Sequence, residues 1–152
     1  MISERVRQGM AAGSVAAAAT AGALVGFGIR GRPASRPFME AGRALLGHDA
    51  ILTASSGAIV LGAGILLHIV AMLVLGVCFS LVAAGLRGVR LLLAASVFSA
   101  LVFVAVHRLL PLPPAPGLMT GWPTPRLVII YVTLALALTA GMRLARPTVH
   151  GR

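Results

Sequence analysis

Long stretches without a charged side chain are the feature of this sequence that most restricts its fold. No Asp, Glu, Lys or Arg occurs from Gln8 to Ile29 or from Ala50 to Leu86. A helix of about 20 apolar residues is long enough to cross the hydrocarbon core of a bilayer. The mean hydropathy is +0.99 and only 11% of the residues are charged, whereas a water-soluble domain needs far more polar surface. The sequence therefore predicts an integral membrane protein.

Four apolar segments define the expected crossings. We predict transmembrane helices at about 9–29, 57–84, 89–110 and 127–145. The segment from Gly85 to Gly88 reads as a tight turn, so the second and third helices are expected to form an antiparallel hairpin. The link 111–126 has six prolines in sixteen residues and should be extended and semi-rigid. The expected fold class is all-α, a polytopic transmembrane four-helix bundle in a single membrane domain over residues 1–152.

The first apolar segment has a second interpretation, as a secretory signal peptide. Arg5 and Arg7 precede an Ala-rich run in which small-residue cleavage sites are easy to find. The run is longer than the apolar part of a usual signal peptide, and further apolar segments follow it. These two features favour an uncleaved first helix.

A short amphipathic helix is predicted at about 36–46, between the first two crossings. Arg36, Glu40 and Arg43 share one face, while Phe38 and Leu45 belong to the opposite, apolar face. One interpretation is an interfacial helix that lies in the plane of the membrane surface. The alternative is a connecting helix that packs against the bundle.

The basic residues bracket the apolar segments and do not form one continuous basic face. All thirteen are Arg, against three acidic residues, and the net charge is +10. This arrangement argues against a nucleic-acid partner and is typical of side chains that reach from helix ends to the membrane interface. Four crossings place seven arginines on the side of the termini and six on the other, which favours cytoplasmic termini in a plasma (inner) membrane. Arg without Lys, together with abundant Ala, Gly and Leu, is typical of a bacterial protein from a GC-rich genome.

Small residues at helical spacing predict close helix packing. Gly9 and Gly13 form one GxxxG motif, and Gly22 and Gly26 form another. Such motifs allow helix backbones to approach each other in a membrane. We interpret them as contacts within the chain, with homodimer contact as the alternative.

No recognisable enzyme motif is present, so no catalytic residue is predicted. Asp and Glu are absent from the four predicted crossings, which argues against a proton-coupled antiporter or an aspartyl membrane protease. Ser96 and Ser99 lack a nucleophile motif, and the single cysteine, Cys78, excludes an internal disulfide. His48 and Asp49 could form only a loose surface site, so no metal-ligating residue is predicted.

His68 and His107 are the candidate functional residues, because they are the only ionisable side chains well inside the apolar segments. Measured from the turn, their depths differ by about 3 Å along the helix axes, so they could face each other. A facing pair could ligate a haem iron or another metal, with Gly64 making room and Arg108 pairing with an anionic group. Quinone or lipid-headgroup binding is a second possibility. A third is that each histidine bonds a carbonyl or a hydroxyl and has a structural role.

The segment 62–83, GAGILLHIVAMLVLGVCFSLVA, is a Gly-rich apolar helix with a central histidine and a later glycine. With the short Gly/Ala first helix, the amphipathic link and a third helix that ends in Leu-Pro, it resembles part of a loose group of small bacterial four-helix integral membrane proteins of the domain-of-unknown-function type. The resemblance implies a fold and a location and no activity.

Three functions are compatible with these features. The first is a non-enzymatic structural or accessory subunit, whose partners are the lipid bilayer and either copies of itself or a larger membrane complex. The second is a haem-, quinone- or ligand-binding module that uses His68 and His107. The third is a small oligomeric channel or carrier.

Overall fold

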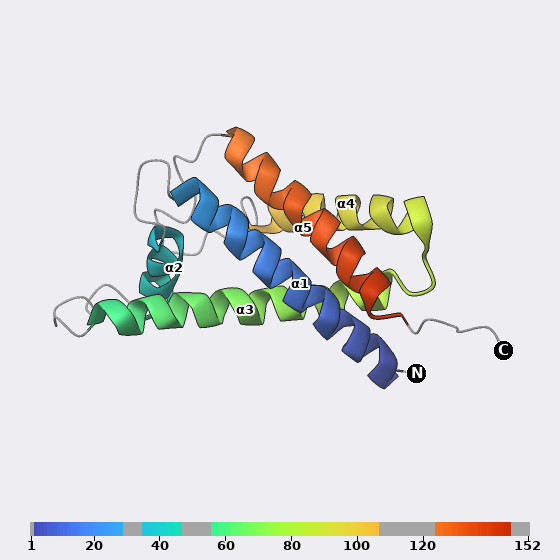
Figure 1. Ribbon diagram of the computed structural model, residues 1–152, viewed down its shortest axis with the longest axis horizontal. Coiled ribbons are helices and arrows are strands. Elements are labelled where there is room, and N and C mark those ends of the chain that lie inside the picture. The colour runs from blue at the N-terminus through green and yellow to red at the C-terminus, as the bar shows by residue number, and fades with distance from the viewer. Residues whose placement is uncertain (1, 29–34, 47–55, 107–123, 147–152) are drawn as a thin grey trace.

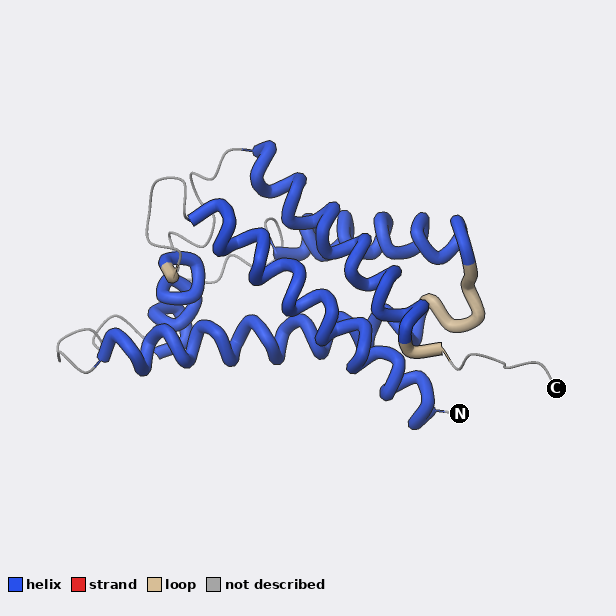
Figure 2. Tube along the Cα trace, viewed as in Figure 1, coloured by secondary structure: helices blue, strands red, loops and turns tan. Residues whose placement is uncertain are grey.

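The computed structural model describes residues 2–28, 35–46, 56–106 and 124–146. Within these ranges the chain is all-α and contains five helices and no strand (Figure 2). The helices are α1 (Ile2–Gly28), α2 (Arg36–Leu46), α3 (Ser56–Val82), α4 (Gly88–Val104) and α5 (Thr124–Leu144). The helices therefore occupy the segments in which the sequence predicts them, although their ends differ by several residues.

Local interactions explain two of the helix ends that differ from the prediction. Helix α1 begins seven residues earlier than expected, and its first turns carry the ion pair between Arg7 and Glu4 (2.7 Å), which Gln8 joins through a hydrogen bond of 3.2 Å. Helix α5 begins three residues earlier, because Pro125 is tolerated in a first turn, where its missing amide costs nothing. The turn between α3 and α4 has Gly85 at φ 82° and Gly88 at φ 57°, a region that glycine tolerates best.

The helices pack in the order α3, α1, α5, α4 (Figure 1). Helix α1 crosses α3 and runs beside α5, and α4 packs on the far side of α5. Helix α2 lies across the first half of α3. The main core is formed by small and large apolar residues of α1, α3, α4 and α5: Ala12, Ala16, Phe79, Ala83, Leu91, Ala95, Leu134, Ala135, Ala137, Leu138 and Met142.

The predicted side-by-side hairpin of α3 and α4 is wrong for the described residues. The two helices are joined by a tight turn, and the rings of Phe79, near the end of α3, and Phe98, in the second half of α4, have centroids 5.4 Å apart. Beyond the turn the pair separates, because α1 and α5 pack between them in the order given above. An apolar helix has no distinct polar face, so its sequence does not show which neighbour it packs on.

Gly9 and Gly13 confirm the prediction of close packing within the chain. A methyl group on Gly13 would lie 2.6 Å from the carbonyl oxygen of Met72, and one on Gly9 would lie 2.5 Å from Cα of Val77. The second motif behaves differently. A methyl group on Gly22 or Gly26 would meet nothing within 4 Å in the described part of the chain, so the described helices do not show the expected packing for this pair.

Among the described residues, three helices are long and apolar enough to cross a membrane: Ile2–Phe27, Gly57–Val82 and Pro125–Leu144. Helix α4 is apolar but has only 17 residues in the described part of the chain. The structure thus supports three of the four predicted crossings by length and composition. The outward surfaces agree with this conclusion, because large apolar side chains such as Leu66, Val97 and Val132 are exposed on α3, α4 and α5. Such exposure is the normal state of side chains that face lipid.

Candidate functional site: the His68 contact of α1, α2 and α3

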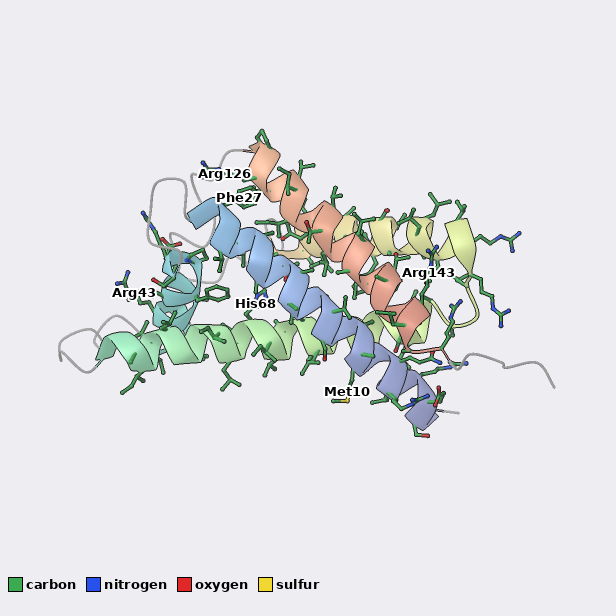
Figure 3. The ribbon with its side chains drawn as sticks, in the orientation of Figure 1. Met10, Phe27, Arg43, His68, Arg126 and Arg143 are labelled. Atoms are coloured by element: carbon green, nitrogen blue, oxygen red, sulfur yellow. The ribbon has the colours of Figure 1, made fainter. Side chains whose placement is uncertain are left out.

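His68 connects α3 to α1 through its imidazole ring. The Nε2 atom lies 3.2 Å from the carbonyl oxygen of Ala17 and 3.2 Å from the hydroxyl oxygen of Thr20 (Figure 3 labels His68 between the two helices). A carbonyl oxygen can only accept a hydrogen bond, so Nε2 must carry a proton to bond Ala17. The hydroxyl of Thr20 donates to the carbonyl of Ala16 at 2.7 Å, and its oxygen is therefore left to accept. Both contacts assign the proton to Nε2.

The position of this proton limits what Nε2 of His68 can bind, whereas Nδ1 keeps its lone pair. A metal or haem iron takes the lone pair of an unprotonated ring nitrogen. Nε2 has none to offer while it donates to α1. A ligand role through this atom would require the ring to release Ala17 and Thr20, and both groups would then lose a partner inside the apolar layer.

Helix α2 covers His68 from a second side. The ring of Phe38 meets the imidazole edge to face, with centroids 5.6 Å apart and an interplanar angle of 85°. Phe38 is buried, together with Gly42. The apolar face predicted for residues 36–46 therefore packs against α3, as the connecting-helix alternative expects. Arg36 remains on the opposite face, where it pairs with Glu40 at 2.6 Å.

Gly64 and Gly42 allow α2 and α3 to cross at backbone distance. A methyl group on Gly64 would collide with the carbonyl oxygen of Phe38, and one on Gly42 with the carbonyl oxygen of Val60. The room that we predict beside Gly64 thus exists, but the backbone of α2 fills it. A cofactor at this place would have to displace α2.

The other predicted site residues lie outside the described part of the chain. These are His107, Arg108, His48 and Asp49. Among the described residues, no group of three or more His, Cys, Asp or Glu side chains could hold a metal ion. The facing pair of His68 and His107 therefore stays a prediction, and the neighbours of His68 are those on α1 and α2.

The sequence interpretation missed the partners of His68. Thr20 does not stand out in a first helix that is rich in small residues, and Ala17 contributes a backbone atom that no sequence pattern reveals. The signal for Phe38 and Gly42 was present, because both lie on the apolar face of 36–46. The sequence of this face does not reveal that it packs on α3 beside His68.

A second feature is an apolar cavity of about 310 Å³ between α4 and α5. Its lining includes Leu92, Ser99 and Phe103 of α4, and Tyr131 and Ala135 of α5. Ser99 is 2% exposed, and its hydroxyl has no hydrogen-bond partner among the described residues. A buried hydroxyl without a hydrogen-bond partner lowers the stability of the fold. The Ser99 side chain therefore fills space without stabilising the contact between α4 and α5.

Comparisons with protein-family models, with curated proteins and with solved structures found no match for this chain.

Proposed function

We propose that this chain is a multi-pass protein of a bacterial plasma membrane with four crossings, cytoplasmic termini and no enzymatic activity. It acts as a structural or accessory subunit. Support for the location comes from the three helices of spanning length and from their exposed apolar side chains. The likeness to small bacterial four-helix membrane proteins belongs to this proposal. In it, α4 is the first part of the third crossing, and α2, packed on α3, turns its basic residues toward the headgroups at the interface.

The observation that carries the proposed role is the use of the polar side chains between the helices. His68 and Thr20 bond each other or the backbone of α1, Ser80 bonds the carbonyl of Arg5 at 2.8 Å, and Thr139 bonds its own helix. Each of these groups holds helices together or satisfies a backbone acceptor. Apart from Ser99, whose hydroxyl has no partner among the described residues, the buried polar side chains are thus used for packing, as a structural role requires.

The side of α4 turned away from α5 is the surface that we assign to a partner. Helix α4 packs mainly on α5, and an exposed apolar stripe runs along it through Val89, Leu93, Val97, Leu101 and Val104. Because α4 has one main neighbour, a contact with a second helix would add most to its stability. In a membrane this contact is made by close packing against another helix and not by burial from water.

Cysteine labelling of sealed vesicles tests the four crossings. In a Cys78→Ala background, Leu45→Cys, Ala84→Cys and Pro125→Cys place one thiol near each loop, and the side chains replaced are exposed. A membrane-impermeant maleimide should label position 84 from one side, and positions 45 and 125 from the other. If positions 84 and 125 are labelled from the same side, α4 does not lead across the membrane and the four-crossing arrangement fails.

Purification in several gentle detergents tests the role as a subunit. We expect the protein to retain a partner in fixed stoichiometry. Leu93→Trp with Val97→Trp on α4 should remove this partner, whereas Leu66→Trp with Val70→Trp on the exposed face of α3 should keep it. A lone monomer in every detergent would refute the subunit role. Equal loss in both double variants would refute the assignment to α4.

A further inference from the structure

The turn between α3 and α4 forms a depression lined by arginines. Its volume is about 430 Å³, and its lining consists of Gly85, Leu86, Arg87, Val89 and Arg90. Arg87 and Arg90 are both exposed and lie on either side of the first residue of α4. The positive φ angles of Gly85 and Gly88 bend the backbone sharply enough to bring these two side chains to one small area.

The segment that follows α5 is bonded to the loop that lines this depression. The guanidinium of Arg146 donates a hydrogen bond to the carbonyl oxygen of Leu86. Figure 3 shows Arg143 at the same end of the molecule, and Arg43 and Arg126 at the opposite end. The loop and the end of α5 are thereby held together, so the arginines of both elements form one basic surface.

Few acidic side chains neutralise the arginines of this basic surface. The end of the molecule that holds the start of α1, the turn and the end of α5 carries six described arginines and one glutamate: Arg5, Arg7, Arg87, Arg90, Arg143, Arg146 and Glu4. The carboxylate of Glu4 is already bonded to Arg7 at 2.7 and 3.2 Å. With six described arginines against one glutamate that is already paired, this end of the molecule attracts an anion.

We propose that the depression at the α3–α4 turn binds the phosphate of an anionic phospholipid headgroup. The planar guanidinium groups of Arg87 and Arg90 each offer paired donors that match phosphate oxygens. The first amides of α4 add further donors, since no side chain caps them. This inference rests on the proposed membrane location, which brings the turn to the level of the headgroups.

Apolar residues beside the arginines favour a lipid over free phosphate. Val89 lines the depression and is exposed, and Val82, at the end of α3, is also exposed. A soluble anion would leave both in contact with water. A phospholipid places its glycerol and the start of its acyl chains against them, while its phosphate meets the arginines.

Native mass spectrometry of the full chain in detergent tests the proposal, with phosphatidylglycerol and phosphatidylcholine as probes. Arg87→Gln with Arg90→Gln should weaken phosphatidylglycerol binding about tenfold, since each basic residue at a membrane surface contributes to anionic-lipid affinity. The control Arg43→Gln with Arg126→Gln removes the same charge from the other end and should change binding less than about twofold. Arg87→Lys with Arg90→Lys should retain part of the binding, because charge remains but the paired donors are lost.

Three results would overturn the proposal: equal weakening in both Gln double variants, no weakening in either, or full competition by millimolar inorganic phosphate. Extraction of membranes with alkaline carbonate separates this failure from failure of the proposed location. If the wild-type chain is released, the membrane assignment fails. If wild type and variants all remain in the membrane and the lipid result is negative, only the headgroup site is wrong.

Discussion

The imidazole Nε2 of His68 donates toward the hydroxyl oxygen of Thr20, 3.2 Å away on the neighbouring helix α1. The same nitrogen lies 3.2 Å from the carbonyl of Ala17, one turn earlier on that helix. Since the ring is also covered by Phe38 of α2, one side chain ties three helices together. A histidine in an apolar layer is a candidate for function by default. In this protein the contacts of His68 explain first of all how α1, α2 and α3 pack together.

A double-mutant cycle measures the link between His68 and Thr20. We expect Thr20→Val and His68→Phe each to lower the free energy of unfolding, with a coupling of about 0.6 kcal/mol, the usual value for polar contacts between membrane helices. The measurement is reversible unfolding in mixed micelles. Thr139→Val is the control, because the hydroxyl of Thr139 is buried and bonds only Ala135 of its own helix. A coupling to Thr139 as large as that to Thr20 would contradict the assigned bond.

The two GxxxG motifs of α1 should respond differently to alanine. Gly13→Ala forces α1 away from α3, because the new methyl group meets the carbonyl of Met72 at 2.6 Å. We expect a loss of about 1–3 kcal/mol, typical of overpacking. Gly22→Ala should change stability by no more than about 0.5 kcal/mol, since its surroundings are open.

The oligomeric state of the Gly22→Ala variant tests the remaining alternative for the second motif. A homodimer contact would require this glycine to approach another chain, and alanine would weaken it. Size-exclusion chromatography with light scattering should show the same mass for wild type and variant if the glycine faces lipid. A lower mass in the variant would identify the Gly22 face as a dimer contact.

The helices could be predicted because their signals are local. Helix α2 is found at Arg36–Leu46 as expected, since Pro33 disfavours an earlier start, Pro37 is tolerated in the first turn and Gly47 follows its end. The spatial order of the helices could not be predicted. Helix α3 is apolar on every side, so its sequence does not distinguish the face toward α1 from the face toward lipid. The tight turn suggested α4 as the neighbour of α3, but α1 takes that place with its closely spaced glycines.

The candidate site was predictable only in part, for a similar reason. His68 and Gly64 stand out in the sequence as a lone imidazole and a small residue one turn before it. Their partners come from positions 17, 20, 38 and 42, which are distant in the sequence. The partner of Gly64 is a backbone carbonyl, which every residue has. Sequence therefore indicates where polar contacts are needed, and the packing decides which helix supplies them.

Helix α2 should detach when its contact glycine is replaced. A methyl group on Gly64 collides with the carbonyl of Phe38, whereas one on Gly62 meets nothing within 4 Å among the described residues. We expect Gly64→Ala to speed tryptic cleavage after Arg43 about tenfold, because about 1.4 kcal/mol of lost docking energy opens the helix ten times more often. Gly62→Ala should cleave at the wild-type rate. Equal rates for all three proteins would show that α2 does not depend on this crossing.

The absorption spectrum tests the alternative in which His68 and His107 bind haem. Because Nε2 of His68 is protonated and directed at α1, we expect protein from haem-replete cells to show no Soret band. A band that is present in wild type and lost in His68→Ala with His107→Ala would overturn this expectation. Retention of the band in the double variant would mean that the haem is held elsewhere.

Two buried serines should give opposite results when changed to alanine. Ser80 is 1% exposed, and its hydroxyl lies 2.8 Å from the carbonyls of Arg5 and Val77, so it links α3 to the start of α1. Removing this bond should cost about 0.5–1.5 kcal/mol. Ser99 is 2% exposed, and its hydroxyl has no partner in the described part of the chain, so Ser99→Ala removes an unsatisfied group and should leave stability unchanged or slightly raised. Unfolding in mixed micelles compares the two. A loss at Ser99 equal to that at Ser80 would mean that the Ser99 hydroxyl has a partner at the α4–α5 cavity.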